Sequence, residues 1–169
     1  MNPEDGAELS EFVSAHGRAL LRTAYVLTGD AADAEDLLQR ALESLVRKWH
    51  AVARADHPEL YVRRIMVNLI IDGHRRQRRR PRLVFATIEQ RAESSDSRFD
   101  DRDQLRAALC RLPPRQRATV VLRYLDGLDT DEVAQLLGCS PGTVKSQLSR
   151  GLAALREAIP ALVEDGPRR

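Results

Sequence analysis

The side chains best suited to recognition chemistry lie between residues 130 and 150, where hydroxyls and long hydrogen-bond donors recur. Such groups donate to phosphate oxygens and to base edges in a DNA major groove. Ala134, Gly138 and Val144 follow one another at spacings of four and six residues, which is typical of a helix-turn-helix. A plain helical hairpin with a solvated polar face is the alternative. The second helix would bury Val144 and expose Thr143, Lys145, Ser146, Gln147, Ser149 and Arg150.

A second candidate surface is a polar stripe on a long predicted helix. Arg64, Asn68, Asp72 and Arg76 recur at four-residue steps, and a basic run covers residues 75–82. Such a stripe can bind phosphates with an affinity that falls steeply with salt. The alternatives are a solvated helix end, where basic residues are favourable, and a hydrogen-bonded core role for Asn68.

Two aromatic residues flank this helix and could stack on unpaired bases. Trp49 falls in line with the apolar residues of the preceding helix, which favours a core position for it, whereas Tyr61 fits either interpretation. The sequence predicts that Trp49 and the apolar residues of the preceding helix lie on one side of a single helix. These residues are Leu37, Leu38, Ala41, Leu42, Leu45, Val46 and Trp49.

No catalytic or metal-binding set stands out in the sequence. The histidines are scattered, at His16, His50, His57 and His74. The two cysteines form neither a disulfide framework nor a four-ligand zinc site by themselves. No glycine-rich loop could cradle a phosphate. We therefore expect no enzymatic activity, no cofactor and no small-molecule substrate.

The elements that position these residues are all predicted helices, since apolar residues recur at three- and four-residue steps and no strand alternation is convincing. Asp30 is a natural N-cap, and Pro58 suits the first position of a helix that runs to about Arg79. Residues 82–102 show little periodicity, and the stretch RAESSDSRFDDRD at 91–103 is polar with mixed charge. We expect an all-α fold with two small helical domains, 8–80 and 103–159, joined by a flexible linker at 81–102.

The charges are strongly segregated along the 169 residues, although the net charge is only +2. Residues 1–46 hold 9 acidic and 3 basic residues, whereas residues 47–82 hold 3 acidic and 11 basic ones. The acidic segment suits a protein partner and the basic one suits nucleic acid. The longest apolar run, 65–71, is too short to cross a bilayer, and the acidic N-terminus is no secretory signal. These features predict a cytoplasmic protein that needs no membrane.

The order of these features resembles the extracytoplasmic-function (ECF) class of bacterial RNA polymerase sigma factors, in particular the actinobacterial SigE-like group. The stretches that carry the resemblance are ALLRTAYVLTGDAADAEDLLQRAL, PELYVRRIMVNLIIDGHRRQRRR and LPPRQRATVVLRYLDGLDTDEVAQLLGCSPGTVKSQLSRGLAALR. The resemblance implies a region 2 domain at 8–80 and a region 4 domain at 103–159. It implies core RNA polymerase and promoter DNA as partners, and it is compatible with an anti-sigma factor as a third partner.

The resemblance also implies roles for individual residues. Family members often carry an acidic residue where this chain has Arg40, which changes the local charge. The resemblance implies that core polymerase is bound by Asp36, Leu37, Gln39, Arg40 and Glu43. It implies that the minus-10 promoter element is contacted by Tyr61, Arg63, Arg64, Asn68, Asp72, Arg75 and Arg76. It implies that the minus-35 element is contacted by Thr143, Lys145, Ser146, Ser149 and Arg150.

A stand-alone helix-turn-helix regulator is the alternative function. It would use residues 1–80 as a dimerisation or ligand domain and would bind a palindrome without polymerase. The uninterrupted basic helix at 63–80 argues against this alternative, because a dimer interface is not normally so charged.

Overall fold

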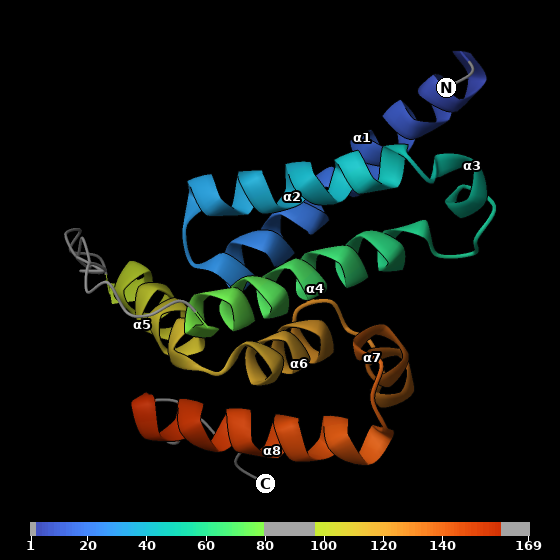
Figure 1. Ribbon diagram of the computed structural model, residues 1–169. Coiled ribbons are helices and arrows are strands. Elements are labelled where there is room, and N and C mark those ends of the chain that lie inside the picture. Colours follow the sequence, from blue (N-terminus) through green and yellow to red (C-terminus); the bar gives the residue numbers. More distant parts are fainter. Residues whose placement is uncertain (1–2, 80–96, 160–169) are drawn as a thin grey trace, which may run out of the picture.

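The computed structural model describes residues 3–79 and 97–159, which form helices and no strand. This confirms the predicted all-α class. Figure 1 shows α4 lying between α2 and α6, with α8 along the edge of the molecule farthest from α2. The helices are α1 (Pro3–Thr28), α2 (Ala31–Val46), α3 (Trp49–Val52), α4 (Pro58–Arg79), α5 (Ser97–Arg111), α6 (Pro114–Tyr124), α7 (Thr130–Leu137) and α8 (Pro141–Ala158). We call α1–α4 the first module and α5–α8 the second module.

The helix starts follow the capping signals of the sequence. Asp30 precedes α2, and its Oδ1 accepts hydrogen bonds from the backbone amides of Ala32 at 2.8 Å and Asp33 at 3.0 Å. Pro58 is the first residue of α4, where the backbone N–H would have no helical carbonyl to bind. The N–H that proline lacks therefore costs the helix no hydrogen bond. The α2 helix ends at Val46, so Trp49 belongs to the short α3 and not to the same helix as the apolar residues before it.

The predicted linker reaches too far along the chain. Its residues up to 96 lie outside the described residues, but residues 97–102 form the first turns of α5. The apolar periodicity begins only at Leu105, because the earlier part of α5 is polar. A helix start made mostly of polar residues gives no apolar periodicity, so the sequence predicts the start of this helix six residues too late.

The larger buried apolar cluster contains residues of both modules. Leu20, Leu45 and Met66 from the first module and Leu122 and Val133 from the second are among its fully buried members. The α4 helix packs on α6 and α7, and α1 packs on α5 and α6. The sequence pattern predicted two separate domains and did not indicate this close packing between them.

Trp49 is part of the core, as its apolar alignment predicted. Its side chain is 5% exposed, and its ring centroid lies 5.6 Å from that of Phe12. Tyr61 is half-buried and packs against the same core.

The α7 helix begins with a capping box. Oδ1 of Asp129 accepts from the amides of Asp131 and Glu132 at 2.8 Å, and Oε2 of Glu132 accepts from the Asp129 amide at 2.7 Å. Three amides that no helical carbonyl can reach are thereby satisfied.

Replacing Asp129 with alanine is expected to lower the free energy of unfolding by about 1 kcal/mol, because two amides lose their acceptor. Urea denaturation followed by circular dichroism measures the loss. Gln135→Ala is the control, since Gln135 is exposed on the same helix. If Asp129→Ala and Gln135→Ala lower the free energy of unfolding equally, the Asp129 cap does not stabilise the protein.

Candidate functional site

The helix-turn-helix predicted from residue spacing is formed by α7 and α8. Gly138 ends α7 with φ +62°, a left-handed conformation that favours glycine. Ser140 caps α8 through its Oγ, which accepts from the Thr143 amide at 3.1 Å. Ala134 is 5% exposed and Val144 is fully buried, so both occupy the contact between the helices. The turn therefore fixes how α8 presents its outer face.

The outer face of α8 carries the predicted minus-35 residues. Lys145, Ser149 and Arg150 are exposed. The hydroxyl of Thr143 lies 3.0 Å from that of Ser140, and the exposed Ser146 donates its hydroxyl to the Thr143 carbonyl at 2.9 Å. The two longest donors of this face thus extend into solvent, while two of its hydroxyls already form hydrogen bonds at the start of the helix.

The polar stripe of α4 is a solvent-exposed face. Arg64, Asn68, Asp72 and Arg76 are all exposed, so the alternative of a core asparagine is wrong. Arg75 Nη1 lies 3.9 Å from Asp72 Oδ1, a weak and exposed ion pair. The side chains of residues 77–82 lie outside the described residues, so the basic run is seen only in part.

Arg63 differs from the other predicted minus-10 residues. It is only 9% exposed, and its Nε lies 3.2 Å from Asp126 Oδ1 of the second module. Arg63 therefore faces away from the exposed stripe, and DNA cannot reach it in this arrangement. Its contact with the minus-10 element stays a prediction; in this arrangement Arg63 and Arg64 lie on different faces of α4, because consecutive helix residues lie about 100° apart around the axis.

An apolar groove of about 400 Å³ lies on the first module. Its lining combines leucines and a valine with polar side chains of α2. Gln39 Nε2 donates to Glu43 Oε1 at 3.3 Å among these polar side chains. The residues that line the groove are Leu21, Glu35, Leu38, Gln39, Leu42, Glu43 and Val46.

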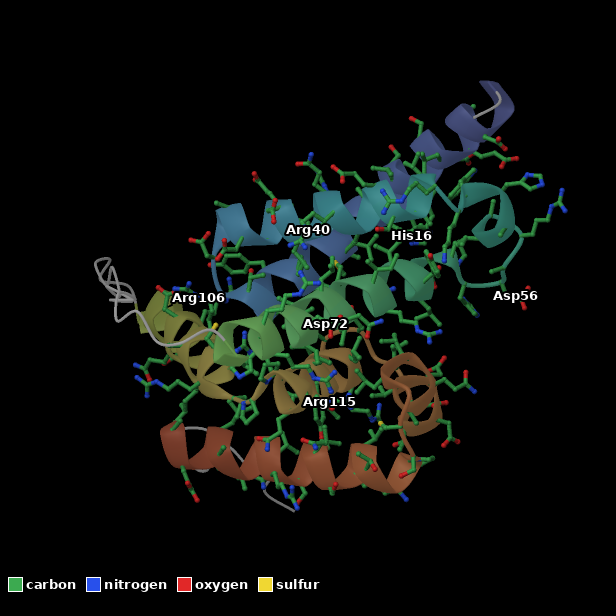
Figure 2. All side chains as sticks on the ribbon, viewed as in Figure 1. His16, Arg40, Asp56, Asp72, Arg106 and Arg115 are labelled. Carbon is green, nitrogen blue, oxygen red and sulfur yellow. The ribbon has the colours of Figure 1, made fainter. Side chains whose placement is uncertain are left out.

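The groove shares two residues with the predicted polymerase-binding set, which stays a prediction. Gln39 and Glu43 line it, but Leu37 is 4% exposed and belongs to the core. Figure 2 labels Arg40 on α2. Its Nη1 lies 3.7 Å from Asp36 Oδ2, and both side chains are exposed, so the unusual arginine has a carboxylate partner. The predicted set does not include Leu38, Leu42 and Val46, which also line the groove. Their four-residue spacing beside the core stripe was the signal that could have revealed them.

Within the ranges that the structure describes, no three His, Cys, Asp or Glu residues come close enough to hold a metal ion. Within the same ranges, no helix is long and apolar enough to cross a membrane.

Known proteins match both modules. The chain matches the descriptions "Sigma-70 region 2" over residues 12–80 and "Sigma-70, region 4" over residues 102–155. It is 39% identical over 152 residues to an RNA polymerase sigma-E factor of Streptomyces antibioticus, which covers 90% of this chain and 84% of that protein. It is 35% identical over 158 residues to the ECF RNA polymerase sigma factor SigE of Mycolicibacterium smegmatis, which covers 88% and 60%. The chain belongs to the ECF class of sigma-70 factors.

The fold of this ECF sigma factor also matches a solved sigma factor. The structure of RpoE in complex with the anti-sigma factor NepR from Bartonella quintana matches with a TM-score of 0.68 and 23% identity. That match covers 88% of this chain and 94% of the other. The region 2 match falls on the first module and the region 4 match on the second, so the groove and the α4 stripe belong to region 2 and the helix-turn-helix to region 4.

Proposed function

We propose that this ECF sigma factor binds core RNA polymerase and directs it to promoters, where it recognises two DNA elements and helps to open the strands. The observation that carries the proposal is the presence of two exposed polar helix faces, one in each sigma module, together with an apolar groove on region 2. Sigma factors are initiation factors. In this proposal the polymerase performs the chemistry, and the sigma factor contributes only binding energy.

The groove is the proposed docking site for polymerase. Leu21 is 37% exposed and Val46 is 41% exposed, so apolar side chains reach solvent beside Leu38 and Leu42. An apolar centre with a polar rim is the usual composition of a protein interface, whereas a DNA contact surface is basic. We assign Asp36, Gln39, Arg40 and Glu43 to the rim of this interface, and Leu37 to the core beneath it.

The two helix faces are the proposed DNA contacts. Residues 8–80 would act on the minus-10 element through the exposed α4 stripe, and residues 103–159 on the minus-35 element through α8. A basic side chain that meets a phosphate strengthens binding in a salt-dependent way, whereas base-edge contacts select the sequence. Arg64, Arg75 and Arg76 suit the first role, while Lys145 and Arg150 suit either role.

An anti-sigma protein is a further proposed partner. The solved sigma factor of similar fold is bound to an anti-sigma factor, and a protein bound to the groove of this chain would exclude polymerase from it. We place the protein in the cytoplasm, where core polymerase and promoter DNA are found.

Multi-round transcription tests the proposal. Purified chain is mixed with sigma-free core polymerase and sheared genomic DNA of the source organism, and the 5′ ends of the RNA are sequenced. We expect discrete start sites that depend on this chain and share two upstream motifs. An absence of starts, together with a gel shift by the chain alone on a palindromic site, would contradict the proposal and favour a stand-alone regulator.

A further inference from the structure

One side of α8 is buried against the rest of the second module. Figure 1 shows α8 running beside α6, and the two helices are in contact. The buried residues of α8 are Val144, Gly151 and Leu155. They follow one another at steps of seven and four residues, which places them on the same side of the helix. Of these three, only Gly151 has no side chain.

The missing side chain at Gly151 lets α8 approach α6 closely. A Cβ at this position would lie 3.0 Å from Cγ2 of Val120, 3.6 Å from Cβ of Gln116 and 3.7 Å from the Gln116 carbonyl oxygen. Carbon atoms in contact ordinarily lie about 3.5–4.0 Å apart, so a methyl group at residue 151 needs roughly 0.5 Å or more of extra space beside Val120. We call this approach of Gly151 to Gln116 and Val120 the Gly151 contact.

Val120 has little freedom to supply the extra space. Its side chain is 7% exposed and belongs to a buried apolar cluster with Leu109, Leu112 and Leu155. A close-packed interior transmits such strain because it has few voids to absorb it. A side chain at residue 151 therefore pushes α8 away from α6.

The start of α8 is held separately from the Gly151 contact. Gly138 ends α7 in a left-handed conformation, and the amide of Cys139 donates to the Ala134 carbonyl at 3.0 Å. Oγ of Ser140 then accepts from the Thr143 amide. Residue 151 lies about 15 Å along the helix from its first residue. A helix that is fixed at its start and pushed outward at this distance tilts.

The polar face of α8 lies opposite the Gly151 contact. Around the helix axis, Ser149 is about 160° from Gly151, whereas Arg150 and Lys145 are about 100–120° away on either side. All three side chains are exposed. A tilt away from α6 therefore moves this face outward, and Arg150 moves most because it is the neighbour of Gly151.

We propose that Gly151 is a positioning residue for recognition of the minus-35 element, because its missing side chain fixes where α8 presents Lys145 and Arg150 to the bases. The proposal rests on the proposed function for the role of α8, but the Gly151 contact does not depend on it. Hydrogen bonds have donor and acceptor about 2.7–3.2 Å apart. A displacement of roughly 0.5 Å therefore weakens a contact that is well aligned in the wild type.

Gly151→Ala tests the proposal with the smallest side chain. Alanine forms helices better than glycine, which offsets the crowded contact, so the variant should stay folded. Transcription with the full chain and sigma-free core polymerase is measured at a mapped promoter and at the same promoter with an altered minus-35 element. We expect the ratio of the two rates to fall about tenfold, as for the loss of one base contact. A variant that is merely less stable lowers both rates and leaves their ratio unchanged.

Gly142→Ala is the matched control. It makes the same substitution on the same helix, but a Cβ at residue 142 would meet Oγ of Ser140 at an ordinary 3.7 Å. We expect this control to keep the wild-type ratio. A ratio that falls equally in both variants would overturn the proposal, because the Gly151 contact would then have no specific effect.

Val120→Ala provides a rescue, since it removes the Cγ2 atom that crowds a Cβ at residue 151. The double variant Val120→Ala with Gly151→Ala should recover the wild-type ratio to within about twofold. Val120→Ala alone leaves a cavity and lowers the free energy of unfolding. The double variant should be more stable than the sum of the two single changes predicts, because the new methyl group fills part of that cavity. Urea denaturation measures this difference without DNA or polymerase.

The outcomes separate the proposal from the proposed function. A folded Gly151→Ala variant that keeps the wild-type ratio, or a double variant that does not recover it, would overturn the positioning role. Additive changes in the free energy of unfolding would overturn the Gly151 contact. If Gly151→Ala does not fold, the double variant decides, because it must then fold and keep the wild-type ratio. A wild type that initiates equally at both promoters would contradict the proposed function of α8, and that outcome is read without any variant.

Discussion

Replacing both Lys145 and Arg150 with alanine is expected to reduce initiation at promoters that need a minus-35 element by on the order of 100-fold. Both side chains are exposed on the outer face of α8, whose start is fixed by the Ser140 cap. A specific contact with a base is worth about 1–3 kcal/mol, and two contacts of about 1.4 kcal/mol each give this factor.

The same double variant should bind core polymerase as tightly as wild type, because the groove lies on the other module. Transcription from a mapped promoter measures the first effect, and the dissociation constant for core polymerase measures the second. Arg156→Ala is the control, since it removes one positive charge from the last turn of α8, where we expect no base contact. Equal losses in the two assays would show that the division of labour between the modules is wrong.

The sequence predicted the helices well where a local signal starts or stops them. Asp30 and Pro58 each act within one turn of the chain, and a helix begins directly after Asp30 and at Pro58. The exposed stripe on α4 was also predictable, because four-residue spacing on a helix places side chains on one face whatever the surroundings.

The packing of the first module on the second could not be predicted in the same way. Arg63 and Asp126 are 63 residues apart, and their contact depends on how two separately predicted modules dock. Periodicity places a residue on a helix face but does not say what covers that face. The minus-10 role of Arg63 rests on the family resemblance, and nothing in the sequence pattern identifies the carboxylate that lies beside it.

The groove shows a finer limit of pattern analysis. The sequence placed all the apolar residues of α2 on one side and treated them as a single core stripe. In the structure Ala34, Leu37, Ala41 and Leu45 are buried, whereas the adjacent row of Leu38, Leu42 and Val46 lines an open groove with Leu21 of α1. A helix whose apolar face is wider than the part that packs into the core exposes the remaining apolar residues. This excess width is the sequence signal of such a surface.

Replacing Leu21 with glutamate is expected to weaken polymerase binding by at least roughly 30-fold, which corresponds to about 2 kcal/mol. Leu21 lines the groove from α1, and its 37% exposure means that the substitution leaves the core packed. Glutamate forms helices well, so α1 should keep its structure. A carboxylate at this position must lose its hydration when an apolar partner surface docks on it. The dissociation constant for core polymerase measures the effect, and circular dichroism confirms the fold.

Val13→Glu is the matched control for this variant. Val13 is also 37% exposed on α1, but it is not among the residues that line the groove. We expect this control to bind polymerase like wild type, and an equal loss in both variants would contradict a specific role for the groove.

Leu21→Lys separates apolar docking from electrostatics. Lysine beside Glu35 and Glu43 has carboxylates of the groove lining as neighbours, so it reverses the charge that glutamate introduces. If the groove binds an apolar anchor of the polymerase, both charged variants lose affinity, because each must be desolvated. A loss confined to the glutamate variant would show instead that charge complementarity with an acidic partner surface governs docking. Retained affinity in both would place the polymerase contact elsewhere on the first module.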